Sequence, residues 1–468
     1  MKRISILLII VSLIAGMISC DGGDGETPVY FADANLEAAT REAVDKPTGD
    51  IYPSDLDGLE SLFAWQKNIS DLTGLEYCTS LTDLLLRENH ITDISPLAGL
   101  ASLRHLDLGE NRISDISPLA GLTNLTDLDL RRNQISDIAP LTSLTSLTYL
   151  YLYINGVSDV APLTNLTNLT FLHLGDNQIS DISPLTNLTN LPRLYLSSNQ
   201  ISDVGPLANL TNLTRLSLHD NQISDIAPLT NLINLTYLSL SSNYISDISP
   251  LANLTNLTYL GLSSNHYISD ISPVASLTNL TELRLPHNQI SDISPLANLT
   301  NLTDLSLYYN QISDISPVAS LTNLTSLRLR HNEISDISPA TNLTNLTAIY
   351  LSSNQITDIA PLANLTSLTY LDLRDNQISD ISPAANLTDL ICLYLNDNQI
   401  SDIAPATNLT ALRELSLDSN HISDIAPLVE NEGLAAGDEV SLTDNPLSSD
   451  SINIYIPQLE ARGVDVSW

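Results

Sequence analysis

Hydrophobic and polar positions follow one pattern that recurs along most of the chain. From residue 125 to 144, leucine stands at 125, 128 and 130, asparagine at 133, isoleucine at 135 and 138, and leucine at 141 and 144. The same pattern begins again at Leu147, which lies 22 residues after its first leucine. The equivalent asparagines keep this step between residues 89 and 420, with one additional residue between Asn265 and Asn288. A fixed period of this length predicts a solenoid of stacked coils.

The first part of each repeat has the period of a β-strand. In one coil Leu128 and Leu130 point to one side, and Asp127, Asp129 and Arg131 point to the other. We therefore expect one short strand per coil, with the leucines in the core and the intervening residues outside. Successive strands would stack about 4.8 Å apart as a parallel sheet.

Three polar positions in each coil have a structural interpretation. The side chain of Asn133 carries both a donor and an acceptor, so the asparagine column predicts a buried ladder of hydrogen bonds. Ser117 and Pro118 predict a helix N-cap followed by the first residue of a short helical or 3₁₀ turn. A column of aspartates equivalent to Asp115 precedes these turns, and we interpret it as capping backbone N–H groups. Calcium binding by this column is the alternative, although its spacing matches no known calcium loop.

The spacing Leu-x-x-Leu-x-Leu-x-x-Asn is the leucine-rich-repeat pattern. We predict an α/β repeat solenoid, a curved right-handed coil with a concave parallel β-sheet, short 3₁₀ or helical turns on the convex side and helical caps at both ends. The expected parts are a lipoprotein signal peptide at 1–20, a flexible tether at 21–29, an N-terminal cap at 30–58, the repeat array at 59–428, and an irregular C-terminal repeat and cap at 429–468.

Both caps have helical signals. Asp33 predicts the N-cap of a helix from 34 to 44, which would cover the open end of the core. The residues expected on its buried face are Leu36, Ala39, Ala43 and Val44. At the other end, residues 450–462 have helical spacing with Gly463 as a stop, and Pro457 either kinks that helix or starts a shorter one.

The first twenty residues have the composition of an export signal. Lys2 and Arg3 precede an apolar run, from 4 to 17, that is too short to remain as a membrane span. The run ends at Met17-Ile18-Ser19-Cys20, which resembles the lipobox of bacterial lipoproteins. This resemblance implies a lipid on Cys20 and an extracytoplasmic location at the bacterial cell membrane or cell surface. An ordinary secretory signal with an incidental cysteine is the alternative.

The composition and the absence of known motifs argue against several classes of function. The formal net charge of −36 argues against nucleic-acid binding. Histidines are scattered, and no phosphate loop, metalloprotease motif or nucleophile elbow occurs, so we predict no catalytic residue, no metal and no cofactor. Cys78 and Cys392 lie too many coils apart to form a disulfide. We expect a monomer.

The outward strand positions are the ones that the repeat leaves free, and tyrosine and arginine are concentrated there. These two residue types dominate the energetically important contacts of protein interfaces. The residues that we expect to bind a partner on the concave face are Tyr149, Tyr151, Tyr153, Phe171, His173, Arg193, Tyr195, Arg215, Tyr237, Tyr259, Arg328, Arg330, Tyr350, Tyr370, Arg374 and Tyr394. The alternative is that tyrosine is simply compatible with strands.

The repeat register divides these residues into two patches. One row is expected to run through Tyr149, Phe171 and Arg193 on successive strands, and a parallel row through Tyr151, His173 and Tyr195, with Tyr153 beside them. A second patch is expected along Arg328, Tyr350, Asp372 and Tyr394, flanked by Arg330, Tyr370 and Arg374. Replacement of the first aromatic residues should then abolish binding with little effect on folding.

Three segments resemble bacterial internalin-like proteins. Residues 31–37 and 72–76 resemble their entry segment, and 113–119, Ile-Ser-Asp-Ile-Ser-Pro-Leu, resembles their repeats and those of a leucine-rich phosphatase-regulatory subunit. The resemblance implies recognition of a partner protein through the concave face, in adhesion or surface interaction. A regulatory scaffold that docks an enzyme such as a phosphatase is one alternative. A glycan-binding surface protein is the other, because exposed tyrosines can stack on sugars.

Overall fold

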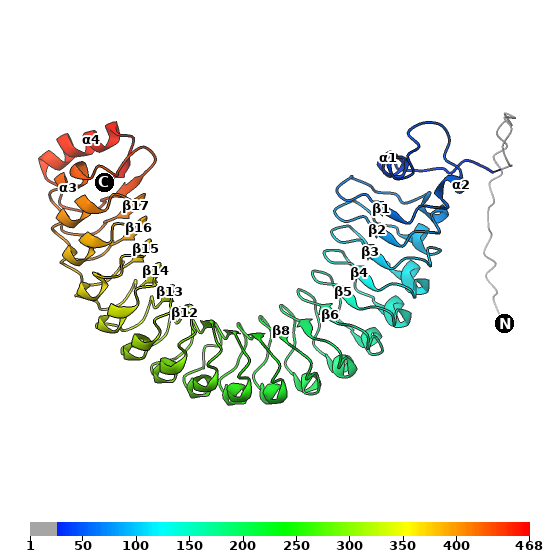
Figure 1. Ribbon diagram of the computed structural model, residues 1–468, viewed down its shortest axis with the longest axis horizontal. Helices are drawn as coiled ribbons and strands as arrows, with labels where there is room; N and C mark the ends of the chain where they lie inside the picture. The colour runs from blue at the N-terminus through cyan, green and yellow to red at the C-terminus, as the bar shows by residue number, and fades with distance from the viewer. Residues whose placement is uncertain (1–25) are drawn as a thin grey trace, which may run out of the picture.

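The computed structural model describes residues 26–468, which form one open arc of stacked coils (Figure 1). Nineteen parallel strands line the inner, concave side, and each pairs with the next strand in the chain. The short 3₁₀ turns lie on the outer, convex side. The predicted fold class, a leucine-rich-repeat solenoid with a concave parallel sheet, is confirmed. The described termini lie at the two ends of the arc and leave its hollow open.

Each strand has three residues, as expected for one short strand per coil. The strands are β1 (Ser61–Phe63), β2 (Asp83–Leu85), β3 (His105–Asp107), β4 (Asp127–Asp129), β5 (Tyr149–Tyr151), β6 (Phe171–His173), β7 (Arg193–Tyr195), β8 (Arg215–Ser217), β9 (Tyr237–Ser239), β10 (Tyr259–Gly261), β11 (Glu282–Arg284), β12 (Asp304–Ser306), β13 (Ser326–Arg328), β14 (Ala348–Tyr350), β15 (Tyr370–Asp372), β16 (Cys392–Tyr394), β17 (Glu414–Ser416), β18 (Glu439–Ser441) and β19 (Asp465–Ser467).

Helical segments are short, and most are single 3₁₀ turns. The 3₁₀ turns are η1 (Leu75–Tyr77), η2 (Ser95–Leu97), η3 (Ser117–Gly121), η4 (Ala139–Ser143), η5 (Ala161–Leu163), η6 (Ser183–Asn187), η7 (Gly205–Leu207), η8 (Ala227–Asn231), η9 (Ser249–Asn253), η10 (Ser272–Ser276), η11 (Ser294–Asn298), η12 (Ser316–Ser320), η13 (Ser338–Asn342), η14 (Ala360–Leu362), η15 (Ser382–Asn386) and η16 (Ala404–Asn408). The remaining segments are α1 (Ala34–Ala43), α2 (Pro53–Leu56), α3 (Ala426–Glu430), the π-helical turn η17 (Ser451–Tyr455) and α4 (Ile456–Ala461). No helix within residues 26–468 is long and apolar enough to cross a membrane.

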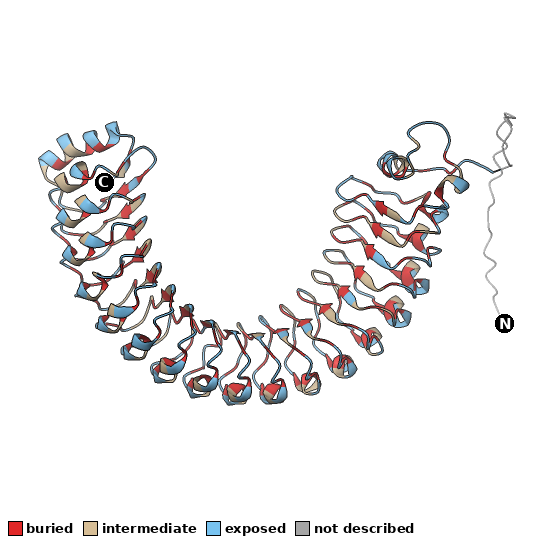
Figure 2. Ribbon diagram, in the orientation of Figure 1, coloured by how far each residue is buried: buried red, intermediate tan, exposed pale blue. Residues whose placement is uncertain are grey.

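The core is a continuous column of leucine and isoleucine between the sheet and the outer turns (Figure 2). Leu128 and Leu130 are both buried, whereas the neighbouring Asp127 and Asp129 are only partly buried on the other side of the strand. The period-2 prediction for the strands is therefore confirmed. Because the same apolar positions repeat in every coil, the fold leaves the outward strand residues free to vary.

The predicted asparagine ladder is also present. Asn111 Nδ2 donates to the carbonyl oxygens of Leu86, Leu108 and Gly109 at 3.0, 3.0 and 3.2 Å. Asn111 Oδ1 accepts the N–H of Ile91 at 3.0 Å. Each asparagine thus connects its own coil to the preceding one, and each group left unpaired by a substitution would cost about 1–3 kcal/mol.

The aspartate column caps the convex turns, as predicted, but the serine that follows it does not. Asp115 Oδ1 accepts the N–H of Ser117 at 2.8 Å, and this backbone hydrogen bond lowers the pKa of Asp115. Ser117 is not the N-cap that the sequence predicted, because the turn η3 already includes it. The aspartate two residues earlier satisfies the N–H, and the serine therefore starts the turn itself.

The N-terminal cap covers the first coil with α1. Asp33 accepts the N–H groups of Asn35 and Leu36 at 2.9 and 3.2 Å, which confirms it as the N-cap. Leu36 and Thr40 are fully buried, and Thr40 Oγ1 donates to Leu36 O at 2.9 Å. Ala43, which we expected on the buried face, is exposed. Thr40 takes its place because the internal hydrogen bond satisfies its hydroxyl.

The ordered contacts begin before the predicted cap boundary at residue 30. The N–H of Val29 donates to Ile51 O at 2.7 Å, and Glu26 accepts the hydroxyl of Ser54 at 2.8 Å. Glu26 and Val29 therefore already contact the cap. The predicted signal peptide, Cys20 and residues 21–25 lie outside the described residues.

The C-terminal cap contains the expected helix and one element that the sequence did not predict. Pro457 lies in the first turn of α4, directly after the π-helical turn, so it starts a shorter helix. Gly463 has a φ of +86° and ends the helical segment, as expected. The chain then adds β19 to β18 in parallel, which extends the sheet by one strand beyond the last predicted coil.

The additional residue at 266–267 leaves the sheet intact but breaks the asparagine ladder once. Strands β10 and β11 keep their register, with Leu260 opposite Leu283. Tyr267 projects into solvent with 58% of its surface exposed, as expected for a bulged loop. Among residues 26–468, however, the buried Oδ1 of Asn288 has no hydrogen-bond partner.

Candidate functional site on the concave face

The outward strand residues lie on the concave face, where the predicted binding residues were placed. Tyr149 is 41% exposed, while Leu150, the next residue of β5, is fully buried. The two predicted rows of the first patch are in register, with Tyr149 opposite Phe171 and Phe171 opposite Arg193. The repeat period therefore places these side chains next to one another across the strands.

The first aromatic patch is a contiguous set of rings on β5 to β7 and the residues that follow them. We define it as Tyr149, Tyr151, Tyr153, Phe171, His173 and Tyr195. Its ring centroids are separated by 6.1 Å for Tyr149 and Phe171, 4.6 Å for Tyr151 and Phe171, 4.3 Å for Tyr153 and His173, 5.5 Å for Phe171 and Tyr195, and 5.0 Å for His173 and Tyr195. These separations are typical of favourable aromatic pairs, so the patch is preorganised before any partner binds.

His173 is the polar centre of this patch and is held neutral. Burial lowers its pKa to about 4, so the ring carries no charge at neutral pH. Its Nδ1 accepts the N–H of Gly175 at 3.3 Å. A Cβ atom at position 175 would lie 3.0 Å from His173 Cε1, so glycine leaves the space that the ring occupies. The first aromatic patch is thus an uncharged surface.

The second patch has the predicted register but a different character. We define it as Arg328, Arg330, Tyr350, Tyr370, Asp372, Arg374 and Tyr394. Arg328 and Arg374 lie 5.4 and 5.1 Å from the ring centroids of Tyr350 and Tyr394. Both arginines are also neutralised, by Asp304 and Asp372 respectively, each at 2.8 Å. The side chain of Asp372 is almost completely buried. Much of the hydrogen-bonding capacity of this patch is therefore used within the protein.

The remaining predicted residues occupy the middle of the arc, between the two patches. Arg193 and Arg215 are exposed and lie opposite each other on β7 and β8. Tyr237 and Tyr259 follow on β9 and β10, with their rings nearly parallel and 4.3 Å apart. Burial and the neighbouring Tyr237 raise the pKa of Tyr259 to about 12. Tyr259 therefore stays uncharged at physiological pH.

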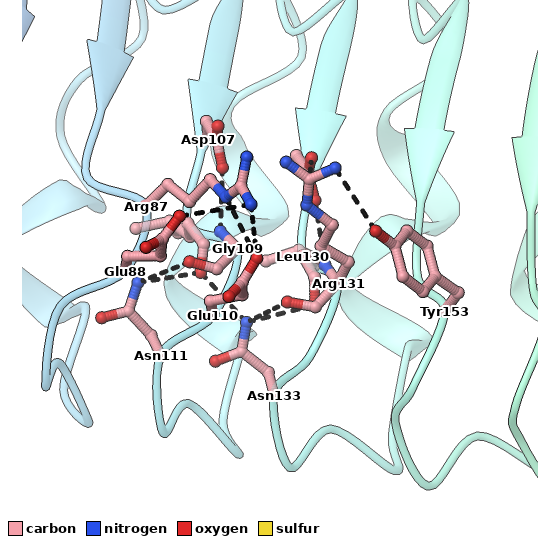
Figure 3. Close-up of polar contacts among 12 residues, drawn as sticks. Arg87, Glu88, Asp107, Gly109, Glu110, Asn111, Leu130, Arg131, Asn133 and Tyr153 are labelled. Carbon is pink, nitrogen blue, oxygen red and sulfur yellow. Dashed lines mark hydrogen bonds and ion pairs between the residues drawn. The ribbon is translucent and has the colours of Figure 1, made fainter. Parts of the chain in front are cut away.

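A charged cluster precedes the first aromatic patch and was not selected from the sequence (Figure 3). Arg87 contacts Glu110 at 2.6 Å, and Arg131 lies 3.2 Å from Asp129 and 5.9 Å from the ring centroid of Tyr153. Burial and the adjacent Asp107 raise the pKa of Asp129 to about 6. The sequence showed these charges on the outward positions, but not that Asp129 is deeply desolvated between them.

A second missed feature lies beside the N-terminal cap. Phe63 and Trp65 are 59% and 56% exposed and line a hollow of about 570 Å³ between α1 and β1. These two residues were not among the predicted binding residues. The register Leu62 to Leu84 shows that the 22-residue step extends back to the first coil, which places both aromatic residues at outward positions.

A third missed feature is a stack of rings at the corner after the strands. His287, Tyr309 and His331 stack with centroid separations of 4.4 and 4.0 Å. All three have positive φ and immediately precede the ladder asparagine of their coil. Burial lowers the pKa of His287 and of His331. The repeat step relates these positions, so aligning the coils would have found the stack.

Within residues 26–468 no three histidine, cysteine, aspartate or glutamate side chains converge on a common metal position. Burial raises the pKa of the Cys78 thiol to about 12, so Cys78 is not a reactive thiolate. The chemistry available on the concave face is stacking, hydrogen bonding and ion pairing.

Comparison with family models matches the model for leucine-rich repeats in two copies. The matched segments are residues 79–121, 101–143, 123–166, 145–187, 189–231, 233–276, 278–320, 322–364, 344–386, 366–407 and 388–430. Comparison with curated protein sequences gives no match.

Solved structures give a similar result. The chain is 40% identical to an internalin, InlF, of Listeria monocytogenes, with a TM-score of 0.62 over 74% of this chain and 97% of that one. It is 26% identical to a leucine-rich-repeat protein of Leptospira interrogans, with a TM-score of 0.70 over 75% and 93% of the two chains. InlJ of L. monocytogenes is 25% identical, with a TM-score of 0.62 over 84% and 82%.

Proposed function

The chain belongs to the leucine-rich-repeat family and is internalin-like, and on that premise we propose that it is an extracytoplasmic, lipid-anchored protein that binds a partner protein through its concave face. The observation that carries the proposal is the first aromatic patch. Six rings pack against one another on positions that the fold does not require to be aromatic. Aromatic residues on a rigid surface lose little conformational entropy on binding.

The neighbouring coils support a selective role for these rings. Ser217, Ser239 and Gly261 occupy the same outward row as Tyr151 and satisfy the fold equally well. Strand compatibility alone therefore does not account for the aromatic residues on β5 to β7. A partner that buries the patch would gain stacking and hydrophobic contacts without displacing an ion pair.

The decisive variant replaces Tyr149, Tyr151, Tyr153 and Phe171 by alanine. We expect loss of partner capture by the purified protein and a nearly unchanged thermal unfolding midpoint, because the leucine column does not depend on these rings. A matched control replaces four exposed tyrosines outside the strands, Tyr30, Tyr77, Tyr244 and Tyr267. Partner capture that survives the first variant, or is lost equally in the control, would exclude the patch as the binding site.

The lipid anchor is a separate part of the proposal and has its own test. In a bacterial host, labelling with a radioactive fatty acid should mark the protein, and globomycin should block its processing. A Cys20→Ser variant should remain unlabelled. Processing that is insensitive to globomycin would leave an ordinary secretory signal as the explanation of residues 1–20.

A glycan is the second candidate ligand, because the exposed ring faces of the first aromatic patch could also stack on sugars. A glycan array tested in parallel with protein capture separates the two ligands. Glycan binding that the quadruple alanine variant removes, with no captured protein, would favour this alternative.

A further inference from the structure

The arginines of the concave face fall into two groups. Eight occupy outward strand positions, and five of these contact a carboxylate. The five ion pairs are Arg87–Glu110 at 2.6 Å, Arg131–Asp129 at 3.2 Å, Arg284–Glu282 at 2.5 Å, Arg328–Asp304 at 2.8 Å and Arg374–Asp372 at 2.8 Å. Among residues 26–468, no carboxylate lies within 4.0 Å of Arg193, Arg215 or Arg330. Most concave arginines are thus already neutralised by the protein itself.

Two of the three unpaired arginines are direct neighbours. Arg193 on β7 and Arg215 on β8 are register partners, and both side chains are exposed. Strands in a sheet are about 4.8 Å apart, and like charges directly opposite each other are destabilising. The chain has 54 acidic residues, yet none of the described ones compensates this pair. Strand β8, which contains Arg215, lies near the middle of the arc (Figure 1).

Stacking orients one member of the pair. The guanidinium of Arg215 lies 4.9 Å from the ring centroid of Tyr237, which in turn stacks on Tyr259 at 4.3 Å. On the opposite side of the tyrosine pair, the guanidinium of Arg284 lies 5.7 Å from the ring centroid of Tyr259. A guanidinium stacked on a ring keeps the N–H donors at its edge free, and that edge has the geometry to bind a carboxylate through two hydrogen bonds.

Small side chains beside the pair leave room for a ligand. Ser197, Ser217 and Ser239 are largely buried at the floor of this part of the concave face. Ser217 Oγ lies 3.1 Å from Nδ1 of the exposed His219. Larger residues, Tyr195 and Tyr237, stand beside this floor on the neighbouring strand positions. A carboxylate on the two arginines would therefore have serine and histidine side chains on the adjacent outward positions.

We propose that Arg193 and Arg215 together bind a carboxylate of the partner protein at the centre of the concave face. This inference rests on the proposed function, because it names the chemistry of the partner for that surface. The carboxylate has two sources, an acidic side chain or the C-terminus of a chain. A polyanion such as a nucleic acid is disfavoured, because the net charge of −36 repels it as a whole. A single carboxylate in a neutral or basic surface avoids that repulsion.

The surroundings of the pair define the rest of the partner surface. The first aromatic patch adjoins Arg193 through Phe171, its register neighbour on β6. Beyond that patch lies Asp127 on β4, whose partly buried carboxylate contacts no arginine among the described residues. The complementary partner segment therefore carries a carboxylate, then apolar or aromatic groups, and then basic groups, in the direction from β8 to β4.

The test measures binding of labelled peptides to the intact protein by fluorescence anisotropy at low ionic strength. One probe is a glycine hexapeptide with a single central glutamate and with acetylated and amidated ends, and a second is acetylated hexaglycine with a free C-terminal carboxylate. The first peptide with glutamine in place of glutamate, and the same peptide with phosphoserine at that position, are the comparison probes. We expect Arg193→Gln with Arg215→Gln to weaken carboxylate binding about tenfold or more, because charge-assisted hydrogen bonds are lost.

Two further variants control for net charge and for geometry. Arg112→Gln with Arg132→Gln removes the same charge from two exposed arginines outside the outward strand positions, and we expect less than about twofold weakening. Arg193→Lys with Arg215→Lys keeps the positive charge but loses the planar guanidinium, which can donate two parallel hydrogen bonds. This variant should therefore bind the carboxylate probes with intermediate affinity. The variants of Arg193 and Arg215 should have unfolding midpoints close to or above that of the wild type, because neither arginine has a carboxylate partner to lose and the glutamine variant also removes the repulsion between like charges.

Each outcome of the binding measurements either supports or overturns the proposal. Binding of the single-glutamate peptide that depends on the pair identifies an acidic side chain, and binding of hexaglycine alone that depends on the pair identifies a chain terminus; both support the proposal. Equal binding by wild type and the double glutamine variant, absence of binding to both carboxylate probes, or preference for the phosphoserine peptide overturns it. None of these results bears on the quadruple alanine variant, so failure of the carboxylate site and failure of the concave binding face are distinguishable.

Discussion

The first aromatic patch and the second patch have the same 22-residue framework and the same parallel register, but they use their outward side chains differently. On β5 to β7 the rings pack against one another, with Arg131 at one edge and Arg193, the register partner of Phe171, at the other. On β13 to β16 the tyrosines stack with arginines that Asp304 and Asp372 already neutralise. Identical backbone geometry therefore supports a surface open to a partner in one region and a largely self-satisfied surface in the other.

This difference predicts that substitutions in the two regions affect different measurements. In the first region, removal of rings should reduce binding and leave stability nearly unchanged. In the second, removal of a charged residue should reduce stability, because its partner remains without compensation. Substitutions of Asp372, Asp129 and Ile154 test this difference between the two regions.

The largest effect on stability is expected for Asp372→Ala. Asp372 accepts hydrogen bonds from Arg374 Nε and Nη2 at 2.8 Å each and from Ser352 Oγ at 3.0 Å. Its side chain is buried, whereas that of Arg374 is 44% exposed, so solvent recovers part of the loss. We expect the free energy of unfolding to fall by about 2–4 kcal/mol in urea denaturation.

Asp127→Ala, on β4 next to the first aromatic patch, is the matched control, because that carboxylate is 38% exposed beside His105. It should cost less than about 1 kcal/mol. If both substitutions lowered stability equally, the distinction between a self-satisfied patch and an open one would be wrong.

The next largest effect on stability is expected at Asp129. It depends on pH, and the substitution should stabilise the protein rather than destabilise it. Burial and Asp107 raise the folded-state pKa of Asp129 to about 6, above the ordinary value of 3.8. The folded protein therefore binds a proton more tightly than the unfolded chain, and Asp129 contributes a loss of stability that grows from about pH 4 and is complete above about pH 6.

Asp129→Asn should then stabilise the protein at pH 7 by about 1–3 kcal/mol and have little effect at pH 3.5. Chemical denaturation at both pH values measures the difference. Asp115→Asn is the control, because a backbone hydrogen bond lowers the pKa of that carboxyl, so its substitution should destabilise at pH 7. A gain for Asp129→Asn that is the same at both pH values would contradict the assigned cause.

Most of the fold and the two rows of the candidate site were predictable, because one period fixes both core and register. Once Leu128 is known to be buried, Asp127 and Asp129 must point outward, and the step of 22 residues aligns Tyr149 with Phe171. The same rows contain the signal for the arginine pair, since Arg193 and Arg215 have aromatic or small neighbours rather than acids. Comparison of neighbouring rows for missing counter-charges would have identified it.

Other features could not be obtained from the period. The strand β19 follows an irregular segment, and its pairing depends on the path of the preceding helix α4. The deep burial of Asp372 depends on side-chain conformations within the second patch. The exposure of Ala43 depends on which residues of α1 face the first coil, and Thr40 fits there only because its hydroxyl bonds to Leu36 O. These are consequences of packing between elements rather than of the repeat.

The smallest predicted effect concerns Ile154, at the corner after the first aromatic patch. Ile154 has a φ of +56°, and the equivalent positions beside the second patch are His331, Ser353, Asp375 and Asp397. A β-branched residue is disfavoured in the left-handed region by about 1–2 kcal/mol, whereas asparagine adopts it readily. Because Ile154 is partly buried, loss of its packing offsets some of the gain, and Ile154→Asn should stabilise the protein by about 0.5–1 kcal/mol.

The same variant sharpens the comparison between the patches, because Ile154 directly follows Tyr153 in the chain. Strained backbone conformations cluster at functional sites, where the strain can be part of the mechanism. A stabilised Ile154→Asn variant with weakened partner capture would link the strained corner to the placement of Tyr153. Ser353→Asn, at the equivalent corner of the second patch, should change neither stability nor binding measurably, because serine at that position introduces no β-branched strain. A destabilised Ile154→Asn protein would instead show that packing of the isoleucine outweighs its backbone strain.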